Sequence, residues 1–399
     1  MIVENHYPED SRVRKEATAV REQYDVTVFA VKRAGQPLHA VVDGVEVYRI
    51  PEIKLEGLSM GSRGLQGMLN KLQYMLQYMW FTSIAAVLFL LTYPSKRYRV
   101  VHANNPPDTL FMVGILCKCL GSKFVYDHHD LAPELYLSRF KRGEDLIYKI
   151  LLLCERLSCR MADVVIATNE SYKQLEVDRH RIPPEKIFVV RNDPLVQECR
   201  LTDAQPLERF PQLNGRKMIL FLGCVNPQDG VDLLLRVIQH LVFQLKEKDL
   251  ICIVIGDGDS LPGLKEMARE LQLEQYVNFL GFSSDREQIK WFLHNSDVCV
   301  EPAPTNPLND RSTFIKVMEY MAAGKPVVAF DLPETSFSIN GSGLLVRPEQ
   351  VEEFAECVKT LLDNNDLRIE LGRRGMQRVE EELNWPRSSA ILLKAYCSL

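Results

Sequence analysis

Short apolar runs alternate with longer amphipathic segments along most of the chain. The short runs are typical of strands buried on both faces, and the longer segments carry apolar residues at helical spacing. This alternation predicts parallel sheets with helices on each face. In the first half, the expected strands are Ile2–Val3, Asp25–Val31, Val45–Arg49, Arg99–His102, Lys123–Tyr126, Asp163–Ala167 and Ile187–Val190. In the second half, they are Met218–Leu222, Leu250–Ile255, Val277–Leu280, Val298–Val300, Val327–Phe330 and Gly343–Val346.

Residues 192–216 separate the two series of expected strands. They contain four prolines or glycines, carry mixed charge and lack periodicity, as is typical of a linker. A chain of 399 residues is too long for one typical core, so we expect an α/β protein with two Rossmann-like domains facing each other across a cleft. The expected division is an N-terminal domain over residues 1–195, a linker over 196–216, a C-terminal domain over 217–375, and a final helix over 376–399 that returns to the N-terminal domain.

The composition narrows the class of protein. The chain is 46% apolar and 25% charged with a net charge of −5, so it lacks the basic excess of a nucleic-acid-binding protein. Its ten cysteines include no C-x-x-C pair, which favours free thiols in a reducing cytoplasm. The N-terminus has neither a basic region nor a long apolar core, so we expect a cytoplasmic protein rather than a secreted one.

The stretch from Pro302 to Phe330 carries the strongest indication of function. It begins with a loop rich in proline and asparagine, continues as a helix expected from Ser312 to Gly324, and ends in a short strand. Ser312 or Asp310 is placed to cap this helix, which leaves the first amides free to point at an anion.

A row of complementary groups is expected along this helix. The amides of Ser312, Thr313 and Phe314 come first, Lys316 follows one turn later, and Glu319 lies on nearly the same face. Amides and an ammonium group suit the phosphates of a nucleoside diphosphate, and a carboxylate suits the hydroxyls of its ribose. An ordinary helix with a glycine cap is the alternative.

The same stretch resembles a known signature. Its pattern E-x-M-A-x-G-x-P-V-V is formed by Glu319, Met321, Ala322, Gly324, Pro326, Val327 and Val328. This pattern resembles the nucleotide-sugar signature of glycosyltransferase family 4, which are retaining enzymes of GT-B fold. The resemblance implies a donor site in the C-terminal domain and an acceptor site in the N-terminal domain. In the family a first glutamate stands eight residues before the second; here Arg311 takes its place, and Asp310 beside it is kept among the expected catalytic residues.

Titratable residues follow the expected strand that ends at Tyr126. Polar groups at the carboxyl end of a parallel strand indicate a site, and a neutral histidine there can donate a hydrogen bond to a sugar. His129 and Asp130 resemble the family's histidine–aspartate pair, whose histidine contacts the donor sugar, so the resemblance implies that role for His129 ahead of His128. The alternative is a histidine that only caps the following helix.

Further donor-binding residues are expected in the loops of the C-terminal domain. Gly223 allows the backbone to approach a phosphate, and Asn226 lies in the same loop. Gly281 and Phe282 resemble the family position at which backbone groups contact the nucleobase.

Two cations that the family uses in the donor site are missing from this chain. Cys224 and Asp229 stand where family members hold an arginine and a lysine. We therefore expect Lys316 to neutralise the diphosphate, with Arg191 as the second candidate.

Asp257 and Asp259 form a D-x-D pattern inside Gly-Asp-Gly-Asp, which predicts a turn rather than a metal site. The resemblance implies that amides and side chains, without a metal or another cofactor, bind the donor phosphates.

Residues 72–93 contain no charged side chain, and Lys96, Arg97 and Arg99 follow closely. A transmembrane span fits by length but would interrupt a parallel sheet whose strands continue on both sides. A core or surface helix is the ordinary interpretation. Peripheral attachment to the inner leaflet, with a lipid-linked acceptor, is the hypothesis that explains the apolar run and the cations together.

The sequence thus predicts a metal-independent, hexosyltransferase-type retaining enzyme. It would move a sugar from a nucleoside-diphosphate donor to a glycan or lipid-linked acceptor, in surface polysaccharide or glycolipid synthesis. Front-face displacement is expected because no nucleophilic carboxylate is identifiable. The alternatives are a degenerate GT-B scaffold, which the missing cations and glutamate favour, and a GT-B sugar-nucleotide epimerase or phosphorylase.

Overall fold

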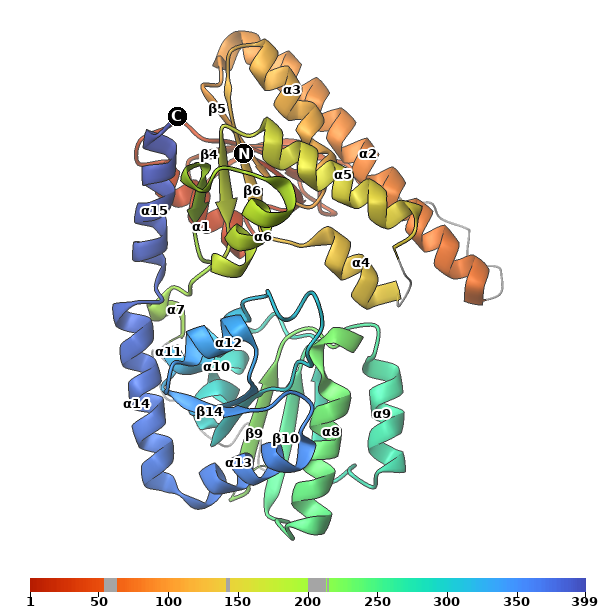
Figure 1. Ribbon diagram of the computed structural model, residues 1–399, viewed down its shortest axis with the longest axis vertical. Coiled ribbons are helices and arrows are strands. Elements are labelled where there is room, and N and C mark those ends of the chain that lie inside the picture. Colours follow the sequence, from red (N-terminus) through yellow and green to blue (C-terminus); the bar gives the residue numbers. More distant parts are fainter. Residues whose placement is uncertain (54–62, 141–143, 200–212, 214) are drawn as a thin grey trace. The chain divides into compact units, whose positions relative to one another are not determined.

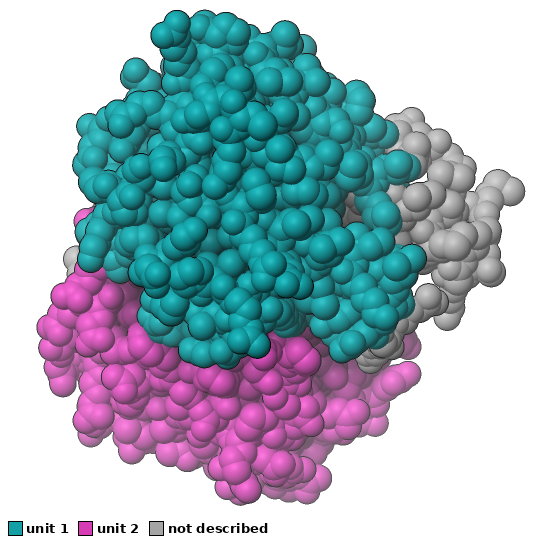
Figure 2. Space-filling view, turned by 45° about the horizontal axis from the view of Figure 1, so that its top comes forward, with its two compact units in different colours: residues 1–137, 141–191, 388–399 teal, residues 138–140, 192–387 magenta. Residues whose placement is uncertain are grey.

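The computed structural model describes residues 1–399 apart from 54–62, 141–143, 200–212 and 214 (Figure 1). The chain forms two compact units (Figure 2). Unit 1 contains Met1–Leu137, Lys141–Arg191 and Ser388–Leu399, and unit 2 contains Ser138–Phe140 and Asn192–Arg387.

Unit 1 is built on an eight-stranded sheet of order β3-β4-β2-β1-β5-β6-β7-β8, in which only β3 pairs antiparallel. From β1 the chain first builds towards β2 and later continues on the other side with β5, so the order of strands reverses between β1 and β5. The strands are β1 (Ile2–His6), β2 (Thr27–Val31), β3 (His39–Val42), β4 (Val45–Ile50), β5 (Val100–Asn104), β6 (Lys123–His128), β7 (Val164–Ala167) and β8 (Ile187–Val189).

The helices of unit 1 cover both faces of this sheet (Figure 1). The crossovers through α2, α3 and α5 all advance in the same direction along the sheet, whereas the crossover through α1 runs the opposite way. Because parallel crossovers are right-handed, α2, α3 and α5 share one face and α1 lies on the other. The helices are α1 (Ser11–Val20), α2 (Arg63–Lys96), the 3₁₀ turn η1 (Asp108–Leu110), α3 (Phe111–Cys119), α4 (Ala132–Phe140), α5 (Leu146–Met161), α6 (Glu170–His180) and α15 (Trp385–Cys397).

Unit 2 is built on a six-stranded parallel sheet of order β11-β10-β9-β12-β13-β14. The order reverses between β9 and β12. The strands are β9 (Lys217–Leu222), β10 (Leu250–Ile255), β11 (Val277–Gly281), β12 (Val298–Glu301), β13 (Val327–Phe330) and β14 (Gly343–Val346). The helices are α7 (Val196–Cys199), α8 (Val231–Gln239), α9 (Leu261–Glu270), α10 (Arg286–Asn295), α11 (Ile315–Ala322), α12 (Pro333–Ile339), α13 (Val351–Asp363) and α14 (Asn365–Glu381).

Two apolar cores cover the faces of the second sheet. On β9, Ile219 and Phe221 belong to one core, and Leu220 and Leu222 belong to the other. All four are buried, which explains why this strand reads as a continuous apolar run.

The observed strands follow the predicted ones, and where their ends differ, most differ by one or two residues. β1, β5 and β6 extend to His6, Asn104 and His128, past the ends predicted from apolar residues alone, and β2 begins at Thr27 rather than Asp25. The antiparallel edge strand β3 was not predicted, because its side chains are exposed or half-buried and carry no clear alternation.

The boundaries of the units differ from the predicted division. The main segment of unit 2 begins at Asn192, and α7 lies within the predicted linker, most of which is outside the described residues. Of the predicted final segment, residues 376–387 belong to unit 2, and residues 388–399 belong to unit 1.

Candidate functional site

The candidate donor site lies in unit 2, at the carboxyl ends of β9 and β12. The order of strands reverses between these two neighbours, which is where open parallel sheets bind ligands. Gly223 follows β9, and Glu301 ends β12. The sequence therefore brings two loops from distant parts of the chain to one point.

The helix that faces this point begins later than predicted. α11 starts at Ile315, and its N-cap is Phe314, which has no side-chain oxygen. The predicted caps are engaged elsewhere: the Ser312 hydroxyl donates to the Leu308 carbonyl (2.8 Å), and Asp310 accepts from the Thr305 hydroxyl (2.8 Å). The predicted start at Ser312 and its capping role are therefore wrong.

The local cause is Asn306. Its side-chain oxygen accepts hydrogen bonds from the amides of Leu308 (3.0 Å) and Asn309 (2.9 Å). Such bonds offer the backbone an alternative to the helix, and residues 307–311 form turns. The Ser312 amide donates to the Asn309 carbonyl (3.1 Å) and is already occupied.

Lys316 occupies the centre of the candidate site. Its Nζ lies 2.8 Å from Oε2 of Glu301, whose side chain is almost fully buried, and 4.2 Å from the centre of the Phe221 ring. A Cβ on residue 223 would lie 3.0 Å from this ammonium group, so Gly223 leaves the room that the lysine fills. Lys316 is thus held directly over the end of β9.

Two carboxyl groups surround this ammonium group. Burial raises the pKa of Glu301, and the nearby charge of Lys316 opposes that rise. Burial likewise raises the pKa of Asp229, again opposed by Lys316. A raised pKa favours the neutral acid, so these groups give up their negative charge more readily than exposed carboxylates do.

The glycine-rich ends of β9 and β10 pack tightly against each other. Gly256 adopts φ +152°, and a Cβ there would lie 1.7 Å from the Gly223 carbonyl oxygen. Asn226 accepts from the Asp259 amide (3.0 Å), and Asp229 accepts from the Asn226 amide (3.0 Å). Asn226 therefore links the two loops, and Asp229 fixes the loop in which Asn226 lies.

The D-x-D pair lies in the second of these loops. The Asp257 carboxylate accepts from the neighbouring Gly258 amide (2.8 Å), and its carbonyl accepts from the Val225 amide (3.0 Å). The first bond is local, as expected of an aspartate that shapes a loop, and the second joins this loop to the loop that follows β9.

Glu319, Gly281 and Phe282, which were also predicted for the donor site, lie on the same unit. Glu319 is half-buried on α11, one turn after Lys316. The next residue, Tyr320, accepts a hydrogen bond from the Leu222 amide (2.8 Å), which fixes α11 against β9. Gly281 ends β11 with φ +75°, and the Phe282 side chain that follows is 77% exposed.

In unit 1, the two neighbouring histidines after Asp127 differ in exposure. His128 is fully buried, with Nδ1 2.9 Å from Glu176 and Nε2 3.5 Å from Glu155. His129 is partly exposed, its amide donates to the Asn105 side chain (2.8 Å), and its Nδ1 lies 3.7 Å from Asp127. Of the two, only His129 is accessible to a ligand. Arg191, the second candidate cation, is buried at the end of unit 1.

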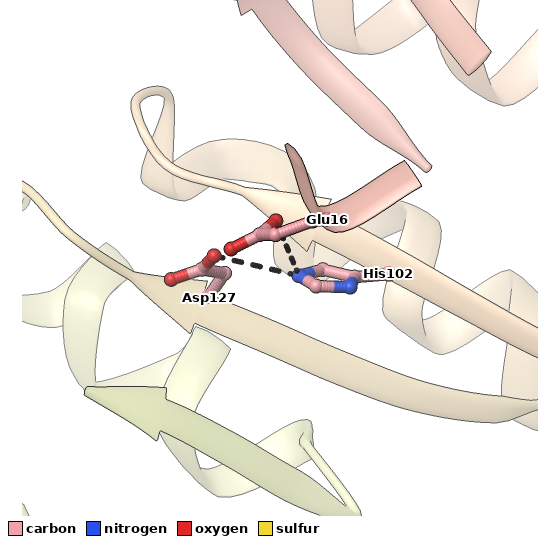
Figure 3. A group of neighbouring side chains, drawn as sticks. All are labelled: Glu16, His102 and Asp127. Atoms are coloured by element: carbon pink, nitrogen blue, oxygen red, sulfur yellow. Dashed lines mark ion pairs between the residues drawn. The ribbon is translucent and has the colours of Figure 1, made fainter. Parts of the chain in front are cut away.

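A buried cluster in unit 1 was not predicted from the sequence. Glu16, His102 and Asp127 converge from α1, β5 and β6 (Figure 3). Arg12 joins the two carboxylates, with Nε 3.1 Å from Glu16 and Nη2 2.8 Å from Asp127. His102 lies 3.5 Å from Asp127, and its other nitrogen lies 2.8 Å from the Tyr396 hydroxyl of α15.

Three of these side chains could in principle ligate a metal ion. However, the Arg12 guanidinium already pairs with both carboxyl groups. Arg12 and His102 outweigh the effect of burial and hold the pKa of Asp127 well below its usual range, whereas burial and the charge of Asp127 raise the pKa of Glu16 well above its usual range. The cluster therefore ties α1 and α15 to the sheet. In the sequence, only a charged residue at the start of the first helix and an aspartate at a strand end indicated this cluster.

Two family models match the chain in succession. Residues 11–193 match the glycosyl transferase 4-like domain, and residues 216–364 match the glycosyl transferases group 1 domain. The chain belongs to the family 4-like glycosyltransferases. The resemblance recognised in the signature of α11 is thereby confirmed.

Two curated relatives of this glycosyltransferase are each 24% identical to it over the aligned part of the chain. Alpha-D-kanosaminyltransferase of Streptomyces kanamyceticus is 24% identical over 278 residues, which are 67% of this chain and 68% of that protein. D-inositol 3-phosphate glycosyltransferase of Corynebacterium glutamicum is 24% identical over 255 residues, which are 61% of this chain and 59% of that protein. The alignment thus spans less than two thirds of the second relative.

Solved structures share the fold of this glycosyltransferase over nearly its whole length. Sucrose-phosphate synthase from Thermosynechococcus elongatus gives a TM-score of 0.74 at 18% identity, over 97% of this chain and 92% of that chain. The Anabaena protein HepE gives a TM-score of 0.74 at 15% identity, over 100% and 98%. The predicted fold class, two Rossmann-like domains in the GT-B arrangement of elements, is confirmed.

Proposed function

We propose that this glycosyltransferase takes a hexose from a nucleoside-diphosphate donor with retention of configuration and transfers it to a glycan or lipid-linked acceptor. The observation that carries the proposal is Lys316, a cation held over the glycine-lined end of β9 at the point where the strand order reverses. A related fold, the Anabaena protein HepE, has been crystallised with UDP-glucose, which supports a nucleotide-sugar donor.

Lys316 replaces the two cations that the family usually supplies and this chain lacks. In the proposed complex its ammonium group and the uncapped amides at the start of α11 bind the diphosphate. The approaching anion raises the pKa of Glu301 further, so Glu301 takes up a proton as the donor binds. Lys316 is then released from its ion pair to neutralise the phosphates.

The remaining roles follow from position and from the resemblance. Glu319, one turn after Lys316, binds the ribose hydroxyls, and the exposed Phe282 ring with Gly281 contacts the base. His129 contacts the donor sugar, and Asp310 is the candidate in place of the missing first glutamate. The leaving diphosphate accepts the acceptor's proton in a front-face displacement, and no metal ion takes part.

A catalytically inactive nucleotide-binding scaffold is the second candidate. Exposed Cys224 and the loop-bound Asp229 stand where the family has cations, which favours this alternative. The two candidates differ in turnover but not in donor binding, so hydrolysis or transfer of a radiolabelled donor distinguishes them.

Thermal-shift measurements with nucleoside diphosphates test donor binding. A matching nucleotide at a hundred times its dissociation constant should stabilise the chain by about 2.7 kcal/mol. Lys316→Met should weaken the diphosphate more than the monophosphate, by roughly 1.5–3 kcal/mol for a charge-assisted contact. Glu319→Ala should weaken both nucleotides alike, because both contain the ribose.

The control for these measurements is an exposed lysine of unit 2 outside the candidate site. Lys265→Met, on the exposed face of α9, should change neither affinity. Equal losses for monophosphate and diphosphate in Lys316→Met would refute the phosphate role. Loss of binding or turnover in EDTA, restored by manganese or magnesium, would refute the metal-free mechanism and direct attention to Asp257 and Asp259.

A further inference from the structure

One outer face of unit 1 is apolar, although it is not covered by any described part of the chain. Among the described residues, nineteen large apolar side chains are exposed, and thirteen of them lie on α2, on α5, or on α3 and the residue that caps it. They are Met75, Leu76, Met79, Trp80, Val87, Leu90, Leu91, Met112, Ile115, Leu120, Leu146, Ile150 and Leu153. These thirteen side chains are called the outer apolar face below.

The three helices that carry this face form one layer. α3 contacts both α2 and α5, and the three lie side by side on the same side of the sheet (Figure 1). On each helix the exposed apolar residues recur at helical spacing, as in Met112 and Ile115 on α3 and Ile150 and Leu153 on α5. The exposed apolar side chains therefore form a stripe on each of three neighbouring helices rather than a scattered set.

α2 is apolar on both of its sides. Phe81, Ala85 and Phe89 are buried against the unit, whereas Val87 and Leu91 on the opposite side are 49% and 71% exposed. A helix of a soluble protein normally presents polar residues outward. Residues 75–96 are long and apolar enough to cross a membrane, yet α2 contacts β1 and β4 through its inner side, and only 22% of its most apolar window is buried.

Positive charge borders the outer apolar face. From Gly57 to Pro107 the sequence has five lysines or arginines and no aspartate or glutamate, in a chain whose net charge is −5. On α3 and α5 the only acid is Glu155, which is fully buried. The exposed cations at this layer are Lys96, Arg97, Lys118, Lys149, Arg156 and Arg160.

Two of these cations are partly neutralised. Lys96 pairs with Glu46 (2.5 Å), and Lys118 pairs with Asp163 (3.3 Å). The others leave a cationic border around an apolar surface, the combination that binds the headgroups and upper acyl region of an anionic bilayer.

We propose that the outer apolar face docks on an anionic lipid bilayer, with α2, α3 and α5 lying in the interface and their cations contacting lipid phosphates. The protein is attached to one leaflet and does not span it, because the inner side of α2 packs on the sheet. This surface goes beyond the proposed function and is independent of it: docking depends on side chains outside the donor site.

Flotation with lipid vesicles tests the surface directly. The intact chain should float with phosphatidylcholine vesicles that contain phosphatidylglycerol, increasingly with its proportion, and should remain at the bottom with phosphatidylcholine alone. The triple variant Val87→Gln/Leu90→Gln/Leu91→Gln should reduce binding roughly tenfold or more, because three exposed apolar groups no longer enter the bilayer. Arg97→Gln/Lys149→Gln/Arg156→Gln should weaken the dependence on anionic lipid, by roughly fivefold for each cation.

Matched control variants show whether the loss of vesicle binding is specific to the outer apolar face. Val41→Gln/Ile369→Gln/Ile391→Gln removes three exposed apolar side chains elsewhere, and Lys248→Gln/Lys265→Gln/Arg373→Gln removes three exposed cations of unit 2. Both should float like the intact chain. Circular dichroism and donor-induced thermal shift should be unchanged in all four variants.

Three results would overturn the proposal. The intact chain could stay unbound at every lipid composition, or the matched variants could lose as much binding as the variants of the face. Alternatively, the intact chain could sediment as an oligomer that Val87→Gln/Leu90→Gln/Leu91→Gln converts to a monomer, in which case the face is covered by a second copy of the chain.

Discussion

At the scale of single residues, the titratable groups buried around His128 make the stability of unit 1 depend on pH. Burial raises the pKa of Glu176 to about 7, although its hydrogen bond with His128 opposes the rise. For His128 itself, burial would lower the pKa, but Glu155 and Glu176 outweigh it and raise the pKa well above 6.5. In both cases the folded state retains a proton that the unfolded state releases at lower pH.

The sign of the resulting pH dependence follows from this comparison. Between the ordinary pKa of a glutamate, 4.5, and the folded value of about 7, the native state binds more protons at Glu176 than the unfolded state does. The free energy of unfolding therefore falls as the pH rises through this window. His128 contributes in the same direction at higher pH.

We predict that Glu176→Gln removes part of this dependence. Between pH 5 and pH 8, the free energy of unfolding of the variant should rise relative to that of the native chain by on the order of 1–3 kcal/mol. The reason is that glutamine keeps the hydrogen bond but cannot ionise. Hydrogen exchange of the β6 and β7 amides under mild denaturant measures it. Glu170 is exposed on the same helix, so Glu170→Gln should have the same free energy of unfolding as the native chain at every pH. If both variants changed the pH dependence of stability equally, the role of Glu176 would be contradicted.

At this scale the sequence predicted which side chains to consider, but not their local geometry. Lys316 was selected because it stands in a row with the helix amides and Glu319. His129 was selected because the core has no use for titratable groups at a strand end and because it resembles the family's histidine; both roles stay predictions. The cap of α11 was misjudged, because the choice between Ser312 and Phe314 depends on where the Asn306 side chain bonds. Glu301 and Arg12 were missed as partners, since their contacts join segments far apart in the sequence.

At the scale of elements, glycines set how closely α14 approaches α11. A Cβ at Gly372 would lie 2.0 Å from the Gly324 carbonyl oxygen, and one at Gly375 would lie 3.1 Å from the Met321 side chain. α14 therefore rests directly on the C-terminal end of the helix that carries Lys316 and Glu319. Only glycine allows backbones to approach in this way.

Gly372→Ala should separate the two helices and destabilise unit 2 by about 2–4 kcal/mol, because backbone atoms cannot move aside as a flexible side chain can. Donor-induced stabilisation should fall as well, since α11 shifts. Chemical denaturation with and without nucleotide measures both effects.

Gly263→Ala is the control for this prediction. Gly263 lies on α9 with no atom within 4 Å of a Cβ, so alanine there should stabilise the helix by about 0.5–1 kcal/mol. If both substitutions stabilise the chain, the close packing of α14 on α11 is wrong.

The order and type of elements were largely predictable because the sheets are parallel and buried on both faces. A buried strand such as β10 is apolar at every position, which no other element of its length requires. The edge strand β3 was not predictable in this way, because its pairing is fixed by the turn at Asp43 and Gly44 rather than by burial.

At the scale of the whole molecule, unit 1 is assembled from separate parts of the sequence. Residues 388–399 belong to it, and Leu392, Ala395 and Tyr396 of this segment are buried. The Tyr396 hydroxyl lies 2.8 Å from His102 Nδ1, next to the cluster of Arg12, Glu16 and Asp127. The segment thus completes a polar core as well as an apolar one.

Ending the chain at Arg387 should unfold unit 1 selectively. Loss of three buried side chains costs about 5 kcal/mol or more, which is comparable to the stability of a domain. Limited proteolysis should then cut within residues 1–191 and leave unit 2 resistant.

Single substitutions in α15 should reduce the stability of unit 1 less than the truncation does. Tyr396→Phe should cost about 1–3 kcal/mol because His102 loses its partner, and Lys394→Ala on the exposed side of α15 should change stability by less than about 0.5 kcal/mol. Equal protease resistance of the shortened and the full chain would contradict the assignment of residues 388–399 to unit 1.

The discontinuity of unit 1 also sets the order in which the protein can mature on the ribosome. Residues 1–191 emerge first, but the segment that completes their core emerges only after residues 192–387 have been translated. At about 5–20 residues per second, those 196 residues take about 10–40 s to synthesise. The outer apolar face of unit 1 therefore waits through that interval on an unfinished domain, where nascent-chain chaperones have their longest opportunity to bind.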